Sequence, residues 1–322
     1  MRVLIVGSSN PWRMEVATEH ALRRAGHETL ILDDRRIKRA IGRRMTQHLV
    51  RARARRFRPD FILLSKCLAL DLETVQQLVA ETANAMWYHD PQWFRDTARP
   101  DIGHIAEVGR LAATFFVTGF DAEWRALGMN AKFLPAAGDA GITSMPANPA
   151  YASDAAFIGT GYDQSRAALL IEVAKHHDVR VYGPAWEQWG KQLKWNGRTV
   201  EGKEFAEVCS SSAVTLGINP SRAQGGVTYT SDRTWMVILA GAFYLGQGTP
   251  GVTQFLRDGE HCAWYNDTAD CLAKLDHYLC DSAARERIRK QGEFFVRANH
   301  TYDQRIANLI SGQAWTVDSV VG

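Results

Sequence analysis

One arginine in the last third of the chain has a setting that points to chemistry. Arg233 lies in the loop Ser231-Asp232-Arg233-Thr234, shortly before an apolar run from Met236 to Leu245. A guanidinium forms charge-assisted hydrogen bonds with phosphate oxygens, and the free N–H groups at a helix start attract the same anion. Ser231 and Asp232 are also typical N-cap residues, which alone would account for them. A cap does not need Arg233, so the loop predicts a diphosphate-binding site.

Two further loops carry candidate binding residues. Thr249-Pro250-Gly251 opens a predicted helix, whose free N–H groups are placed to meet a phosphate or sugar hydroxyls. Gly159-Thr160-Gly161-Tyr162 follows a predicted strand and precedes a helix, as half of a dinucleotide fingerprint would. Gln164 stands where that fingerprint has its third glycine, and the next strand does not end in a ribose-binding acid. A tight turn is the alternative explanation for each glycine.

The first half of the chain has a weaker loop of the same kind. Gly7 and Ser8 follow the first predicted strand and are candidate binding residues, but the loop Gly7-Ser8-Ser9-Asn10 holds only one glycine. Asp33 does follow the second strand, as a ribose-binding acid would. With the glycines incomplete in both halves, a nicotinamide dinucleotide site, and with it a dehydrogenase, is disfavoured.

A candidate base lies in the segment Trp87-Tyr88-His89-Asp90-Pro91, at the carboxyl end of a predicted strand. Imidazole titrates near neutral pH, and a neighbouring carboxylate can orient it or replace it. His89 and Asp90 are therefore predicted to deprotonate an acceptor hydroxyl. The alternative is that Asp90 only forms a turn before Pro91.

The elements that must position these loops alternate between strand and helix. Continuous apolar strands in such an alternation predict parallel sheets covered on both faces, which is an α/β fold. A segment rich in Ala, Gly, Pro, Asn and Ser from Pro135 to Ala152 interrupts the alternation. We expect two Rossmann-like, doubly wound domains facing a central cleft. Their ranges are 1–140 and 153–300, with 301–322 as a helical tail packing back on the first domain.

The composition of the 322 residues limits the class of protein. The longest apolar run is too short to cross a bilayer, and the start of the chain reads as a buried strand rather than a signal peptide. The five cysteines are widely spaced and lack a zinc-binding pattern, so we expect reduced thiols in a cytoplasmic protein with no metal. The oligomeric state is left open.

The net charge of +3 is unevenly distributed. Arg35 to Arg58 contains eleven basic residues and no acid. Apolar residues within it recur every three or four positions, which predicts one amphipathic helix with a basic outer face. Such a face can hold nucleic acid or a membrane surface, and it can equally be a solvated helix. The apolar positions are Ile37, Ile41, Met45, Leu49 and Ala52.

The order of the motifs resembles the CgeB-like (spore-maturation-type) glycosyltransferases of the group-1 GT-B superfamily. The resemblance covers nearly the whole chain and is more specific in its second half. The matching pieces are Phe157-Ile158-Gly159 with Arg166, Tyr182-Gly183-Pro184 with Trp186, Gly197 to Gly202, Leu216 to Asn219, Ser231 to Thr234, Ala240 to Phe243, Thr249-Pro250-Gly251, Asp258 to His261, His300 to Arg305, Phe57 to Asp60 and Trp87 to Pro91.

The resemblance implies roles for individual residues. Tyr182, Gly183 and Trp186 would border the nucleobase of a nucleotide-sugar donor, together with backbone near Val200–Gly202. The loop Ser231–Thr234 would hold the diphosphate, and Thr249 to Gly251 would lie near the sugar. One position departs from the family, which commonly has a ribose-binding glutamate where this chain has Met236. The departure implies an altered donor or lost activity.

The implied activity is transfer of a sugar from a nucleoside-diphosphate sugar, with UDP as the expected nucleotide, to an acceptor hydroxyl. No obligatory cofactor is expected. The basic helix and the tryptophans suggest a hydroxymethylated base in DNA as one acceptor, and anionic glycans or membranes are the alternatives. A non-catalytic module that binds a nucleotide sugar or a polyanion is the competing function, motivated by Met236.

Overall fold

The computed structural model describes residues 1–90, 101–220 and 229–316. The chain divides into two compact units. The first comprises Met1–Asp139 and the segment that begins at Tyr302, and the second comprises Ala140–Thr301. Each unit has its own sheet and its own buried core.

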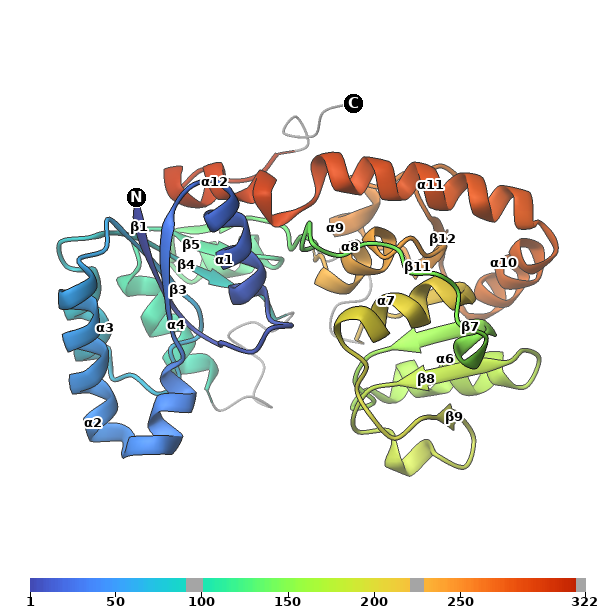
Figure 1. Cartoon of the computed structure of the whole chain (residues 1–322), viewed down its shortest axis with the longest axis horizontal. Coiled ribbons are helices and arrows are strands. Elements are labelled where there is room, and N and C mark those ends of the chain that lie inside the picture. The colour runs from blue at the N-terminus through green and yellow to red at the C-terminus, as the bar shows by residue number, and fades with distance from the viewer. Residues whose placement is uncertain (91–100, 221–228, 317–322) are drawn as a thin grey trace. The chain divides into compact units, whose positions relative to one another are not determined.

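The first unit contains a sheet of six parallel strands in the order β2-β1-β3-β4-β5-β6 (Figure 1). Val3 to Val6 of the inner strand β1 are fully buried, as expected for a strand covered on both faces. The strands are β1 (Arg2–Val6), β2 (Glu28–Leu32), β3 (Phe61–Leu64), β4 (Ala83–Tyr88), β5 (Phe115–Val117) and β6 (Ala131–Phe133).

Two groups of helices pack together in the first unit. Helix α1 contacts η4 and α12, which come from the end of the chain, while α3 contacts α2 and α4. The helices are α1 (Met14–Arg24), α2 (Asp34–Phe57), α3 (Leu72–Val79), α4 (Ile102–Leu111), α5 (Asp121–Ala126), η4 (Tyr302–Arg305) and α12 (Ile306–Ser311).

The C-terminal segment is held in the first unit by polar contacts. Arg305 is fully buried, its Nε donates to the Pro135 carbonyl at 3.2 Å, and its guanidinium lies 3.8 Å from the ring centre of Trp315. Arg24 on α1 pairs with Asp303 at 2.8 Å. Chain from beyond the second unit therefore completes the packing of the first.

The expectation of one continuous amphipathic helix after β2 is wrong. Helix α2 is interrupted at Gly42, whose backbone (φ 78°, ψ 163°) is not helical, so the two segments do not share one face. Ile41 and Met45, predicted to be buried, are 43% and 56% exposed. The buried residues of the second segment are instead Thr46, Gln47, Val50 and Ala54.

The second unit has a parallel sheet in the order β12-β11-β10-β7-β8-β9. The connections reverse direction between β7 and β10, which is where ligands of doubly wound sheets bind. The segment after β8 is rich in tryptophan and contains the short strand β9. The strands are β7 (Ser153–Ile158), β8 (Val179–Tyr182), β9 (Lys194–Trp195), β10 (Ser212–Gly217), β11 (Tyr244–Gln247) and β12 (Ala263–Tyr265).

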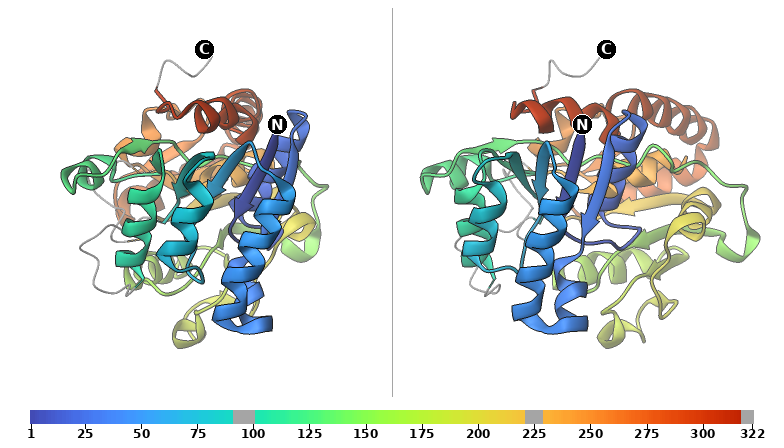
Figure 2. Two further views of the ribbon diagram at one scale, coloured as in Figure 1. Left: turned by 90° about the vertical axis from the view of Figure 1, so that its left-hand side faces the viewer. Right: turned by 60° about the vertical axis from the view of Figure 1, so that its left-hand side comes forward.

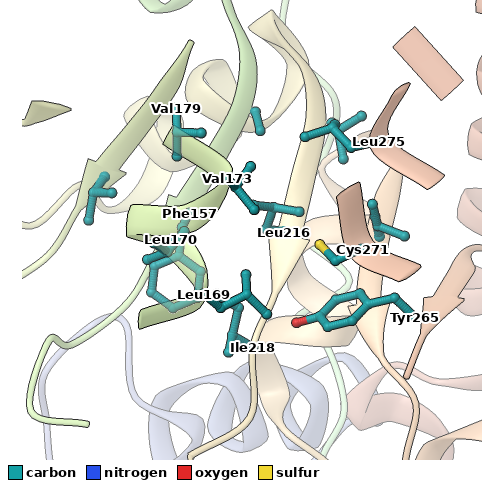
Figure 3. Packing of buried hydrophobic residues seen from close by; sticks show 14 of the residues in the cluster. Phe157, Leu169, Leu170, Val173, Val179, Leu216, Ile218, Tyr265, Cys271 and Leu275 are labelled. Atoms are coloured by element: carbon teal, nitrogen blue, oxygen red, sulfur yellow. The ribbon is translucent and has the colours of Figure 1, made fainter. Parts of the chain in front are cut away.

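Helices cover both faces of the second sheet. Helix α6 contacts α10, while α8 contacts α11. Figure 3 shows part of the core, in which Leu170 and Leu275 pack near the strand residues Leu216 and Tyr265. The helices are η1 (Pro149–Tyr151), α6 (Gln164–Ala174), η2 (Glu187–Trp189), α7 (Gly202–Ser211), α8 (Asp232–Leu239), α9 (Pro250–Thr253), α10 (Thr268–Cys280) and α11 (Ser282–Asn299).

The helices of both units differ from membrane-spanning segments. Among the described residues, none of the helices combines the length and apolar character needed to cross a bilayer.

Candidate functional site

Two arginines from different helices lie against the same phenylalanine in the second unit. The guanidinium carbon of Arg233 is 5.2 Å from the ring centre of Phe157, and that of Arg166 is 5.9 Å from it. Phe157 is near the carboxyl end of β7, and the arginines lie in the first turns of α8 and α6. Arg166 also donates from Nε to the Ile218 carbonyl, at 3.0 Å, beyond the end of β10. The arginines therefore meet at the strand-order reversal.

These two positive charges are not neutralised within the described part of the chain. Neither Arg166 nor Arg233 forms an ion pair with a described carboxylate. Burial and, secondarily, the charge of Arg233 lower the pKa of Arg166 to about 10. Arg166 remains charged at neutral pH, so a buried cation is held close to the partly buried Arg233 at a cost in free energy. An anion bound between them would offset that cost.

The three glycines of this region are needed for close packing between loops. A Cβ on Gly159 would lie 2.6 Å from Nη2 of Arg233, and one on Gly161 would lie 2.3 Å from the Ala185 carbonyl oxygen. Gly183 has φ 122°, and a Cβ there would be 2.3 Å from the Gly159 oxygen. The tight-turn interpretation thus misses their role. They let the loops after β7 and β8 touch each other and Arg233.

The residues expected around a nucleobase are mostly buried. Trp186 is fully buried, and its indole N–H donates to the Gly159 carbonyl at 2.8 Å. Tyr182 and Val200 are also buried. The Trp186 indole thus supports the loop at Gly159, and contact between these three side chains and a nucleobase stays a prediction.

The loop that begins α8 uses its hydroxyl groups internally. Ser231 is the N-cap residue, and its Oγ accepts from the N–H of Arg233 at 3.3 Å. The Thr234 hydroxyl is 3.1 Å from the Tyr244 hydroxyl, in the interior. Asp232 is exposed and Met236 is partly buried. Arg233 is thus the residue of this loop whose side-chain polar atoms have no described hydrogen-bond partner.

The segment after β11 differs from the expected helix start. Helix α9 is a single turn, and the N–H groups of Val252 and Thr253 already bond to the Thr249 carbonyl. The expectation of several free N–H groups there is wrong. Instead, Thr249 Oγ1 and Gln247 Oε1 are buried oxygens with no hydrogen-bond partner among the described residues. Gly251 packs directly on the backbone of Tyr229.

At the corresponding edge of the first unit, Gly7 lies beside a carboxylate. A Cβ on Gly7 would be 2.9 Å from both Glu15 and Ser65 side-chain carbons. Glu15 Oε1 accepts from the Ser65 hydroxyl at 2.8 Å and from the Ser8 N–H at 3.4 Å. Glu15 and Ser65 were not predicted from the sequence. Their positions after β1 and β3 were the available signal, because parallel strands end at one edge.

Beside the predicted pair His89 and Asp90 lies a lysine, Lys66, that was not predicted from the sequence. Lys66, which follows β3, pairs with Asp90 at 2.6 Å. Burial, together with the charge of Lys66, lowers the pKa of His89 to about 3, so His89 is neutral at neutral pH. His89 Nδ1 has no hydrogen-bond partner in the described part of the chain. Pro91, the last residue of the predicted motif, lies outside the described residues.

Neither unit shows the side-chain grouping of a metal centre in the part of it that the structure describes. The described residues contain no group of three or more His, Cys, Asp or Glu side chains arranged to hold a metal ion.

Comparison with solved structures identifies the fold. Anabaena HepE, solved with UDP and glucose, is 10% identical with a TM-score of 0.66 over 97% of this chain and 99% of that chain. The chain has the GT-B glycosyltransferase fold. An α-glucosyltransferase solved with UDP and a 13-mer DNA containing an HMU base is 10% identical. Its TM-score is 0.63 over 97% of this chain and 99% of that chain. Sucrose-phosphate synthase of Thermosynechococcus elongatus is 11% identical, with a TM-score of 0.66 over 97% of each chain.

The sequence comparison covers a smaller part of the chain than the structural one. Residues 166–311 of this GT-B chain match the model of a family described as glycosyl transferase-like. That range contains both arginines of the site and the whole of α8. No curated protein matches the chain. The CgeB-like subtype remains a prediction.

Proposed function

We propose that the protein is a glycosyltransferase that takes its sugar from a nucleoside-diphosphate sugar, with UDP as the nucleotide. The observation that carries the proposal is the pair Arg166 and Arg233, which both lie over the ring of Phe157 without a described counter-ion. A diphosphate supplies two negative groups for two guanidinium groups. As the glycosidic bond breaks, negative charge grows on the departing diphosphate, and Arg233 stabilises it.

The donor sugar would lie beyond the end of β11. Thr249 Oγ1 and Gln247 Oε1 are buried there without described partners, and an unpaired buried oxygen costs about 1–3 kcal/mol. A sugar hydroxyl donating to either oxygen would recover part of that cost. No obligatory cofactor or metal enters this proposal, since the guanidinium groups carry the charge stabilisation.

The acceptor hydroxyl would be deprotonated by Asp90 of the first unit. Its side chain is 26% exposed and fixed by Lys66, whereas Nδ1 of His89 is buried. A base must reach the proton that it removes, which favours the partly exposed Asp90 over Nδ1 of His89. His89, neutral beside the pair, packs against Trp87 with ring centres 5.1 Å apart and supports the strand end.

The test is donor binding followed by turnover. A thermal-shift screen of nucleotide sugars should raise the melting temperature with UDP-sugars, because a ligand that binds only the folded state stabilises it. UDP release should then depend on an added acceptor. Melting temperatures unchanged by every nucleotide sugar at saturating concentrations would overturn the donor assignment.

The acceptor in this proposal is a hydroxymethylated base in DNA. Its support is the five basic residues from Arg51 to Arg58 and the DNA bound in the α-glucosyltransferase structure. Mass spectrometry of hydroxymethylated DNA after incubation with UDP-sugar tests it, against unmodified DNA as the control. An unchanged mass, with UDP release supported by a glycan acceptor, would remove DNA and leave the donor half intact.

A second candidate function is a non-catalytic module that binds a nucleotide sugar. It is favoured by Met236, since a thioether accepts hydrogen bonds poorly where a glutamate would bind ribose. UDP-sugar binding without transfer or hydrolysis would support this alternative over the enzyme. All five cysteines are free, which supports a reducing compartment such as the cytoplasm as part of the proposal.

A further inference from the structure

The first half of α2 forms an exposed projection, which we call the α2 elbow and define as residues 35–45. The non-helical backbone of Gly42 joins its two helical segments. Ile41 and Met45, on either side of this joint, are 43% and 56% exposed. Figures 1 and 2 show the bend of α2 extending past the ends of α3 and α4 within the first unit.

The elbow is also strongly cationic. Its six basic side chains are exposed, and none forms an ion pair with a described residue. No acidic residue occurs from Arg35 to Arg58. Six like charges within eleven residues repel one another, so folding alone gives no reason to gather them. The six are Arg35, Arg36, Lys38, Arg39, Arg43 and Arg44.

The elbow is anchored at both ends to the loop between β3 and α3. The buried Asp34 accepts from the Ala69 N–H at 2.7 Å. Gln47 donates to the Ala69 carbonyl at 2.8 Å and accepts from the Asp71 N–H at 3.1 Å. Val50 is fully buried below it. The anchored backbone therefore keeps the side chains of Ile41 and Met45 exposed to water. Their exposure costs hydrophobic free energy, and no contact within the fold offsets it.

We propose that the α2 elbow docks on the surface of an anionic lipid bilayer. Ile41 and Met45 would enter the boundary between headgroups and acyl chains, and the basic side chains would meet lipid phosphates. Each arginine or lysine near such a surface contributes about 1 kcal/mol, and the buried aliphatic groups add to this. The inference does not depend on the proposed glycosyltransferase activity.

The apolar pair decides between a bilayer and nucleic acid. DNA phosphates are neutralised by cations alone, and sequence-independent binding needs no aliphatic side chains. A bilayer interface takes up both components of the elbow, the cations at its surface and the aliphatic groups just below. Two exposed aliphatic side chains among six exposed cations therefore fit a lipid surface better than a phosphate backbone.

The experiment is co-sedimentation of the full-length protein with lipid vesicles at near-physiological salt. We expect binding to phosphatidylcholine vesicles that contain phosphatidylglycerol, and little binding to phosphatidylcholine alone. The double variant Ile41→Ser, Met45→Ser should lower the partition coefficient by about tenfold. Both side chains are exposed, so the variant should keep the melting temperature of the parent.

Matched controls separate the elbow from general effects. Phe294→Ser removes a side chain that is 79% exposed on α11 of the second unit, and it should leave vesicle binding unchanged. Arg39→Gln with Arg43→Gln should weaken binding to anionic vesicles and make it less sensitive to salt. Duplex DNA retention is measured on the same proteins.

Two results would overturn the proposal. The first is no preference for anionic vesicles over neutral ones. The second is tight, salt-sensitive DNA retention, with vesicle binding that does not respond to loss of Ile41 and Met45, which would assign the elbow to nucleic acid. A drop in vesicle binding for the serine variant, with DNA retention unaltered, supports the lipid assignment. UDP binding is measured in parallel and is expected to be equal in all variants.

Discussion

The two units share one architecture but differ in the charge at the carboxyl ends of their strands. In the second unit, two arginines share Phe157, and no described carboxylate pairs with them. In the first unit, the corresponding edge holds Glu15, which accepts from Ser65, and Asp90, which pairs with Lys66. One edge is cationic with unmet hydrogen-bonding capacity, and the other is acidic and internally paired.

The difference indicates which half of a reaction each unit could serve. A desolvated cationic edge favours a doubly charged leaving group, whereas a paired carboxylate favours a neutral hydroxyl whose proton it can accept. The same strand–helix connections thus support opposite electrostatics, because function depends on the loops at the strand ends rather than on the sheet.

The largest effect is expected at the cationic edge. Arg233→Ala should lower turnover by about 10³-fold, since the group acts on charge that develops in the transition state. UDP binding, measured by calorimetry, should weaken in parallel. Arg257→Ala removes an exposed arginine of the same unit that pairs with Glu260 and should have no effect. Full activity in the Arg233 variant would contradict the role of the cationic edge in stabilising the departing diphosphate.

A somewhat smaller effect is expected at the acidic edge. Asp90→Asn should lower turnover by about 10²-fold, because a general base contributes on that order or more. UDP binding should stay the same, since the change lies in the first unit. Lys66→Met should shift the pH dependence of turnover. Loss of UDP binding in the Asp90 variant would contradict the assignment of the donor to the second unit and of the acceptor to the first.

Gly159→Ala should have an intermediate effect that is confined to the donor. The added Cβ would lie 2.6 Å from a terminal nitrogen of Arg233, and a flexible side-chain end can move aside. We expect KM for the donor to rise about tenfold while the melting temperature changes little. Gly183→Ala is the contrasting variant, because its Cβ would meet backbone at φ 122° and should destabilise the fold.

The last prediction concerns stability against pH rather than turnover. The pKa of His89 is about 3 in the folded chain, below its ordinary value of 6.5. Between these values the unfolded chain binds a proton that the folded chain does not, so stability falls as pH drops from about 6.5 toward 3. Denaturant titrations of His89→Asn should show a flatter decline over that range. An equally steep decline would assign it to other groups.

Much of the fold was predictable because buried parallel strands have a simple signature. The strands, the helices before and after β11, and the break between α10 and α11 near Asp281 follow from apolar runs and turn residues. The buried face of α2 was not predictable, because the spacing of its apolar residues does not show that the helix is broken at Gly42. Strand β9 is too short to produce a recognisable period.

At the candidate site, the sequence by itself determined which loops and residue types were available. Arg233, Gly159, Gly161 and the His89-Asp90 pair stood out by type and position, and the family resemblance added Arg166 and Gly183. Only the tertiary structure decided their partners: that both arginines share Phe157, that Lys66 pairs with Asp90, and that Trp186 is part of the core. The reason is physical. Burial, desolvation and ion pairing depend on residues far apart in the chain, which come together only when the strand ends converge.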